Sequence, residues 1–240
     1  MKLKGLTIIQ IILGIISIIG ISILLTSVSN FIYYIFINNF NIEEYFFNNT
    51  VKSITLDEAK EAYNLLIDYV ILGSEFKGLG VLKYNDLGLS HLDDVRNLYF
   101  NIKLVTVFSI GIFSILCVLF KKDSMFSYSK FNNKTPYFYI GLIPLIFVSI
   151  ILLIGIMDFN TLFDLFHKVV FKSNFAMNTT ENEYINILPS QYFMIMFIVI
   201  GVLVILFSSL FIVLDYLIIR KEIKGMSKVK QDILGKISDI

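Results

Sequence analysis

The stretch that decides the fold is FMIMFIVIGVLVILFSSLFIVLDYLII, residues 193–219, in which Asp215 is the only charged side chain. A transmembrane helix needs about 20 apolar residues to cross roughly 30 Å of hydrocarbon. This stretch is therefore long enough to span a membrane, and similar runs occupy residues 6–26, 104–120 and 138–157. We predict an all-α membrane protein with four transmembrane helices.

The overall composition agrees with this prediction. Apolar residues make up 56% of the 240 residues, and the mean hydropathy is +0.77, whereas a soluble domain has about 45–50% apolar residues. The formal net charge is only +1, so the sequence does not favour nucleic acid as a partner. The single cysteine, Cys117, excludes an intrachain disulfide and a cysteine-built zinc site.

Basic residues are concentrated in three short segments. Residues 1–5, 121–137 and 220–240 hold 12 of the 20 lysines and arginines. Because lysine and arginine accumulate on the cytoplasmic side of a membrane, we expect both termini in the cytoplasm. Residues 27–103 and 158–192, which carry 14 of the 19 acidic residues, are then expected outside the cell.

The first apolar run has a second interpretation. The basic leader MKLKG and the small residues Ser27 and Ser29 also fit a cleaved signal peptide. The apolar core of a signal peptide has about 7–15 residues, and the run at 6–26 is longer, which favours a retained anchor. Since repeats and flexible linkers are absent from the sequence, we predict one integral membrane domain over residues 1–240.

The long segment between the first two spans contains helical signals. Thr55-Leu56-Asp57-Glu58 has the pattern of a capping box, apolar residues follow at helical spacing, and Gly73 ends the pattern. We predict a small, mainly helical extracytoplasmic domain here. Residues 75–88 fit either a short hairpin or an irregular loop.

The sequence has two histidines, His91 and His167, and both fall in the segments expected outside. A Walker loop, HExxH, GxSxG and paired CxxC motifs are absent from the sequence. Because the pKa of histidine lies near neutrality, an imidazole can take a proton from one group and return it to another. We predict that the two histidines share one pocket near the outer leaflet.

His91 belongs to the segment SHLDDVRNLYF. Ser90 is predicted to cap a helix, with Asp93 in the capping box, which would place His91 in the first turn. The positive end of the helix dipole would then lower its pKa. Asp94, three residues on, could orient the ring. The alternative interpretation is a charged, solvated helix entrance.

His167 belongs to DFNTLFDLFHKVVF, where Asp158 or Asn160 could cap a helix. The apolar stripe of this helix consists of Phe163, Phe166 and Val170. We expect the helix to lie at the membrane interface, with Asp164 one turn before His167. The alternative is an interfacial histidine that contacts only water and headgroups.

Three segments resemble the lipoprotein intramolecular transacylases of low-GC Gram-positive bacteria. They are HLDDVRNLYF at 91–100, LFHKVVF at 165–171 and INILPSQYF at 185–193. The resemblance covers the length, the four spans and both histidine segments. Phe175 departs from it, because that family is expected to have a tryptophan there. Leu92 and Arg96 replace a methionine and a lysine.

The resemblance implies an acyltransferase that moves the sn-2 acyl chain of a diacylglyceryl lipoprotein to the α-amine of its N-terminal cysteine. It places function on His91, Asp94 and Arg96, and on Phe166 and His167. For the chemistry we expect His167 as general base and His91, oriented by Asp94, as acid or oxyanion stabiliser, with Arg96 as a second electrostatic candidate. The candidates for substrate binding are Phe163, Asp164 and Phe166. No metal or organic cofactor is implied. The expected partners are diacylglyceryl lipoproteins and membrane lipids, and the expected state is a monomer.

Two other functions are compatible with the composition. The chain could be a non-catalytic membrane protein that binds a lipid or a protein partner through its outer segments. A transporter or channel would need ionisable groups near the middle of the bilayer, and the spans offer almost none. Asp215 lies near the cytoplasmic end of the last span, where we expect it to reach toward Arg220 or Lys221.

Overall fold

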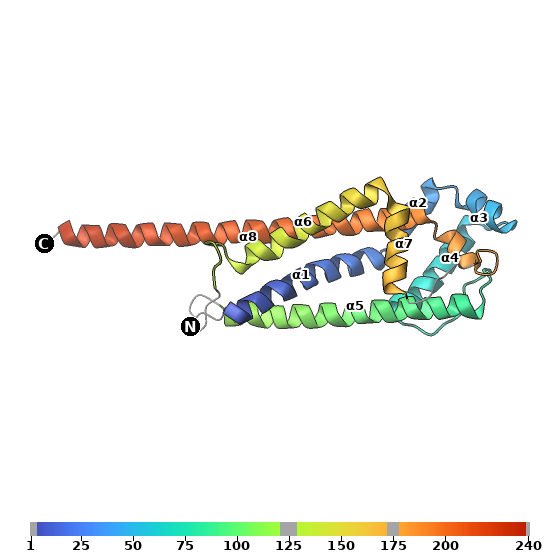
Figure 1. Cartoon of the computed structure of the whole chain (residues 1–240), viewed down its shortest axis with the longest axis horizontal. Helices are drawn as coiled ribbons and strands as arrows, with labels where there is room; N and C mark the ends of the chain where they lie inside the picture. The colour runs from blue at the N-terminus through green and yellow to red at the C-terminus, as the bar shows by residue number, and fades with distance from the viewer. Residues whose placement is uncertain (1–3, 121–128, 172–177, 239–240) are drawn as a thin grey trace. The chain divides into compact units, whose positions relative to one another are not determined.

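The computed structural model describes residues 4–120, 129–171 and 178–238. For Lys228 and residues 230–238 it describes the backbone alone. Four of its helices are long and apolar enough to cross a membrane. They are α1 (Lys4–Ser27), α5 (Asp86–Leu119), α6 (Pro136–Met157) and α8 (Ser190–Ser238) (Figure 1). The prediction of four long apolar helices is confirmed. In α5 the last charged residue is Lys103, so the apolar part of this helix begins after it.

Shorter helices occupy the segments between the spans. Between α1 and α5 the chain forms α2 (Asn30–Asn39), α3 (Ile42–Thr50), α4 (Leu56–Ile67) and the π-helical turn η1 (Asp68–Leu72). After α6 it forms α7 (Phe159–Val170) and the 3-10 turn η2 (Glu183–Ile187). Residues 75–85 contain no strand, so the irregular loop and not the hairpin is observed there.

The chain divides into two compact units. The first contains residues 1–19, 107–149 and 203–240, and the second contains 20–106 and 150–202. The two histidines and all the helices between the spans belong to the second unit.

A buried carboxylate organises part of the first unit. Asp215 is 1% exposed, accepts a hydrogen bond from the backbone N–H of Thr135 at 2.9 Å, and lies 3.6 Å from the ammonium of Lys134. Asp215 therefore caps the start of α6 from another helix. The expectation that Asp215 reaches toward Arg220 or Lys221 is wrong. Its partners, Lys134 and Thr135, lie about 80 residues away in the sequence, so neighbouring residues could not indicate them.

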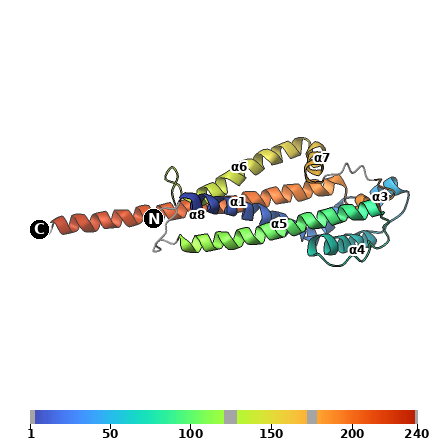
Figure 2. The ribbon, with the colours of Figure 1, turned by 60° about the horizontal axis from the view of Figure 1, so that its bottom comes forward.

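The second unit has its own core, formed by α2, α3, α4, the start of α5 and η2. α4 begins with the predicted capping box, in which the Thr55 side chain accepts from Glu58 N–H and the Glu58 side chain accepts from Thr55 N–H. Gly73 ends η1 with a positive φ of 80°, a conformation that suits glycine. α4 lies beside the first turns of α5 in both views (Figures 1 and 2).

Candidate active site

The helix that carries His91 starts one turn earlier than the sequence suggests. α5 begins at Asp86, and the Asn85 side chain accepts a hydrogen bond from Gly88 N–H at 2.9 Å. Asn85 is therefore the capping residue, and Ser90 lies inside the helix. The prediction that Ser90 caps this helix is wrong. His91 is the sixth residue of α5, beyond the first turn in which the helix dipole acts most strongly.

The segment before α8 packs closely against this first turn. Asn182 accepts from the backbone N–H of Asn85 at 3.1 Å, and the Tyr184 hydroxyl donates to Gly88 O at 3.1 Å. A Cβ at residue 88 would lie 1.8 Å from Asn182 Oδ1, a distance that no side chain allows. Glycine at 88 thus lets the two segments meet and fixes the start of the helix that carries His91.

His167 lies near the end of α7. This helix is capped by Asp158, whose side chain accepts from Thr161 N–H at 3.1 Å, as predicted for one of the two candidate caps. The Nδ1 atom of His167 lies 2.8 Å from Phe163 O. A carbonyl oxygen can only accept, so we assign the proton to Nδ1. In the neutral ring, Nε2 then carries the lone pair, which is the form required of a base.

The two imidazoles lie together. Their ring centroids are 6.3 Å apart with an interplanar angle of 26°. Phe171 packs edge-on against His91 at 4.9 Å and lies 5.6 Å from His167, and Phe163 packs against His167 at 4.2 Å. The prediction that α5 and α7 bring the two histidines close together is confirmed, whereas a pocket that both rings line stays a prediction.

The surroundings of His91 favour its neutral form. The side chain is 8% exposed, and burial lowers its pKa from the usual 6.5. The nearby His167 lowers the pKa further, since two positive rings would repel each other, whereas the charge of Asp94 raises it. Desolvation is thus the largest cause of the lowered pKa of His91.

The family of this chain follows from comparison with known proteins. A family model described as lipoprotein intramolecular transacylase Lit matches residues 8–193, more than three quarters of the chain. The chain belongs to this transacylase family. Comparison with curated proteins gives no significant match.

Solved structures of the transacylase from Bacillus cereus share the fold. One in meso structure of that enzyme has 25% sequence identity and a TM-score of 0.76, and the match covers 91% of this chain and 96% of that chain. A second, with a histidine replaced by arginine, has 24% identity, a TM-score of 0.72 and coverage of 91% and 92%. A third, with a histidine replaced by alanine, has 24% identity, a TM-score of 0.70 and coverage of 92% and 94%.

In this transacylase Arg96 and Asp93 contact the end of the α4–η1 segment. The Tyr69 hydroxyl donates to the Asp93 carboxylate, and the Arg96 guanidinium lies over the Tyr69 ring at 4.6 Å. Arg96 also donates to Gly73 O at 2.8 Å. These contacts tie α5 to the preceding helices on the turn after His91. Sequence analysis missed Tyr69, because it has no motif and contacts α5 only in the folded chain.

The predicted substrate-binding residues differ in exposure. Phe166 is 44% exposed, and its ring lies 5.5 Å from that of His167. Phe163 is half-buried and also packs on Phe193 of α8 at 5.0 Å. Asp164 is exposed. Phe175, the departure from the family pattern, lies outside the described residues.

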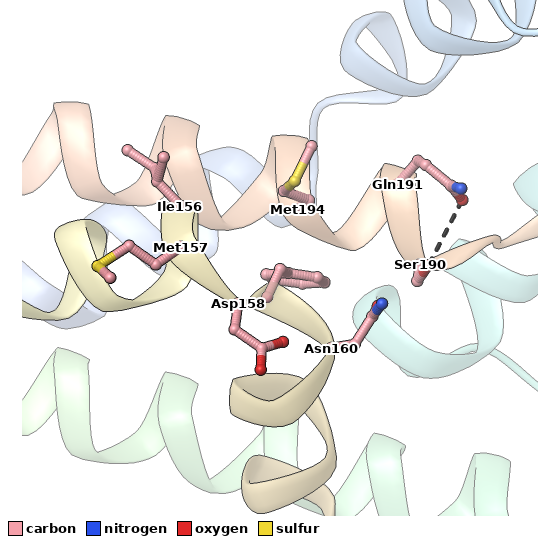
Figure 3. A pocket seen from close by; sticks show the side chains of 8 residues that line it. Ile156, Met157, Asp158, Asn160, Ser190, Gln191 and Met194 are labelled. Carbon is pink, nitrogen blue, oxygen red and sulfur yellow. Dashed lines mark hydrogen bonds between the residues drawn. The ribbon is translucent and has the colours of Figure 1, made fainter.

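An open notch lies at the other end of α7 (Figure 3). It has a volume of about 290 Å³ and is lined by Asp158, which caps α7, by Asn160 of α7, by Ser190 and Gln191 of α8, and by neighbouring apolar residues of α6, α7 and α8. Neither histidine lines it.

No group of three or more metal-binding side chains occurs in the described parts of the chain.

Proposed function

We propose that this transacylase moves the sn-2 acyl chain of a diacylglyceryl lipoprotein to the α-amine of the same lipoprotein's N-terminal cysteine. The observation that carries the proposal is the pair of imidazoles 6.3 Å apart, enclosed by Phe163 and Phe171. One chain supplies both rings, so we propose that the catalytic unit is a single chain.

His167 acts as the base. Its Nε2 takes the proton that the attacking amine loses, and the hydrogen bond from Nδ1 to Phe163 O stabilises the imidazolium that forms. The new C–N bond gives a tetrahedral intermediate. When the C–O bond breaks, His167 returns the proton to the glyceryl oxygen. The α-ammonium first releases one proton to solvent, and the proton that the attacking neutral amine then loses ends on the glyceryl oxygen, so no co-reactant is required.

His91 stabilises the oxyanion. Its lowered pKa keeps the ring neutral, so a ring N–H can donate a hydrogen bond to the carbonyl oxygen as negative charge develops there. A charged His91 beside a charged His167 would be unfavourable, which suits a mechanism with one imidazolium at a time. The charge of Asp94 partly offsets the lowering of the His91 pKa.

Part of the expected rate acceleration comes from the structure of the substrate itself. The amine and the ester belong to one molecule, and well-oriented intramolecular attack can reach effective molarities of about 10⁵–10⁸ M. An acyl-enzyme is then unnecessary. We assign Phe166 and Phe163 to the acyl chain and Asp164 to the α-ammonium, because the exposed carboxylate lies one turn before His167. Arg96 is a positioning residue that holds α5 through Gly73 and Tyr69.

We further propose that both histidines lie outside the cell and both termini inside, at the cell membrane. The excess of basic residues in segments 1–5, 121–137 and 220–240 supports this orientation. Retention of α1 is supported by its packing, because a Cβ at Gly14 would meet Ile140 at 2.7 Å. In a Cys117→Ser background, Glu61→Cys should react with an impermeant thiol reagent in intact cells and Lys221→Cys should not. The opposite pattern would invert the orientation.

The chemistry is tested by mass spectrometry of lipoproteins from cells that make only the diacyl form. Expression of the chain should leave the intact lipopeptide mass unchanged, while the fragment that carries the α-amine gains one acyl group. An increase of the intact mass by one fatty acid would show transfer from a separate lipid and contradict the intramolecular route. An unmodified α-amine would contradict the proposed function.

A further inference from the structure

The last helix is longer than a membrane requires. α8 has 49 residues, about 74 Å at ~1.5 Å per residue, whereas the hydrocarbon core is about 30 Å thick. After Ile219 the sequence becomes rich in lysine, but the helix continues to Ser238 (Figure 1). The end of α8 therefore leaves the membrane as a helix.

This end of α8 has exposed apolar side chains. Ile223 is 57% exposed, Met226 66% and Val229 58%. Water disfavours such exposure, and helices in proteins gain most of their stability from packing of an apolar face and not from helix propensity. The described part of the chain leaves these side chains uncovered, so a partner that buries them would stabilise the helix.

The sequence of this end repeats every seven residues. The a positions of the repeat are Tyr216, Ile223, Lys230 and Ile237, and the d positions are Ile219, Met226, Ile233 and Ile240. From Lys221 onward, every b, c and f position is polar or glycine. Uncharged large side chains at a and d with polar outer positions are typical of a coiled coil.

Lys230 is the exception within the seam. A single polar residue at an a position lowers the stability of a coiled coil but fixes its register and its number of strands. The pattern thus favours pairing of the helices in one fixed register.

We propose that the membrane-distal end of α8, residues 216–238, forms a parallel coiled coil with the same segment of a second copy of this chain. Two copies inserted in one membrane have the same orientation, so their α8 helices emerge side by side and parallel. Confinement to the membrane raises the local concentration of the segments and favours a short coiled coil. The dimer rests on the membrane assignment and not on the acyl-transfer mechanism, and it differs from the monomer expected from the sequence.

Disulfide cross-linking in membranes tests the proposed seam. In a Cys117→Ser background, Ile223→Cys at position a and Met226→Cys at position d should give disulfide-linked dimers under mild oxidation. The matched controls are Lys221→Cys at position f and Lys224→Cys at position b, which should give several-fold less dimer. Equal cross-linking at all four positions, or none at 223 and 226, would overturn the proposal.

Two further variants test the energetics. Met226→Glu should reduce the cross-linking of Ile223→Cys several-fold, because it places like charges in the seam. Lys230→Ile should increase that cross-linking, since it removes a charged pair from the seam. No change in either variant would contradict the coiled coil. Acyl transfer, measured on the same samples, is expected to stay unchanged, so a loss of transfer bears on the proposed function and not on the dimer.

The alternative is that the apolar side of this α8 segment lies on the membrane surface, because basic amphipathic helices also bind anionic lipids. A fluorophore on Met226→Cys, in vesicles of phosphatidylcholine and phosphatidylglycerol, should not be quenched by spin-labelled phosphatidylcholine. Strong quenching would show that the segment lies on lipid, and the coiled coil would be rejected.

Discussion

Two aromatic clusters in the same unit of the molecule use their polar groups in different ways. In the tyrosine cluster, Tyr33 and Tyr63 stack at 3.7 Å, and the hydroxyls of Tyr63 and Tyr192 share a hydrogen bond of 2.7 Å. Each of these three side chains is at most 3% exposed. In the histidine cluster, His91 and His167 lie among phenylalanines, and Phe166 at its edge is 44% exposed.

We assign the tyrosine cluster to the stability of the fold and the histidine cluster to proton transfer. The tyrosine hydroxyls bond to one another and to Ile187 O at 3.0 Å, and burial raises the pKa of Tyr63 to about 12, so this cluster exchanges no proton near neutral pH. In the histidine cluster, burial lowers the pKa of His91, and the assigned tautomer of His167 keeps a basic nitrogen. Four predictions test this contrast, in order of decreasing effect.

The largest expected change is at the tyrosine cluster. Tyr192→Ala removes a buried ring and a hydroxyl partner, and should destabilise the protein by about 3–5 kcal/mol. Phe166→Ala removes a half-exposed ring and should cost much less stability while slowing acyl transfer. Thermal unfolding in detergent and transfer assays on both variants measure this. An equal decrease of unfolding temperature in Phe166→Ala and Tyr192→Ala would contradict the assignment of different roles to the two clusters.

A smaller effect is expected at the start of the helix that carries His91. Gly88→Ala forces Asn182 away and should destabilise the protein by about 1–3 kcal/mol and slow transfer. Gly111→Ala in the same helix is the control, because no atom lies within 4 Å of the added Cβ, and it should be neutral or stabilising by up to about 1 kcal/mol. Equal unfolding temperatures for the two variants would argue against the close packing at residue 88.

The pH dependence of stability should reveal the buried imidazole. The pKa of His91 is lower in the folded state than its usual 6.5, so the unfolded chain binds more protons below that pH. Stability should therefore fall as the pH decreases from about 6.5 toward the folded pKa, by at most about 1.4 kcal/mol per pH unit for one proton. His91→Gln should show a shallower decrease of unfolding temperature. An identical or steeper slope would contradict the desolvation of His91.

The smallest effect concerns Asp94. Because its charge raises the pKa of His91, Asp94→Asn should lower that pKa further and reduce transfer only moderately. The chain has two histidines, so nuclear magnetic resonance of ring-labelled histidine can follow each one separately. A rise of the His91 pKa in Asp94→Asn would show that the carboxylate acts in another way.

The sequence predicted the features that depend on local spacing. The four apolar helices, the capping box at Thr55 and the cap at Asp158 follow from neighbouring residues. The cap of α5 was misplaced, because Gly88 resembles a loop residue until its contact with Asn182 is known. Asp215 was misread for the same reason, since its partner Thr135 lies 80 residues away. The contacts of Arg96 with Tyr69 likewise exist only in the folded chain.

The central claim is that the paired imidazoles carry out the transfer, and one assay of purified variants tests it most directly. A diacylglyceryl lipopeptide with an isotope label in its sn-2 chain is incubated with wild type, His91→Ala, His167→Ala and the double variant, each first shown to be folded. We predict that wild type moves the label to the α-amine, that both single variants lose nearly all of this activity, and that the double variant is no worse than His167→Ala. Full label transfer by the folded double variant would contradict the account.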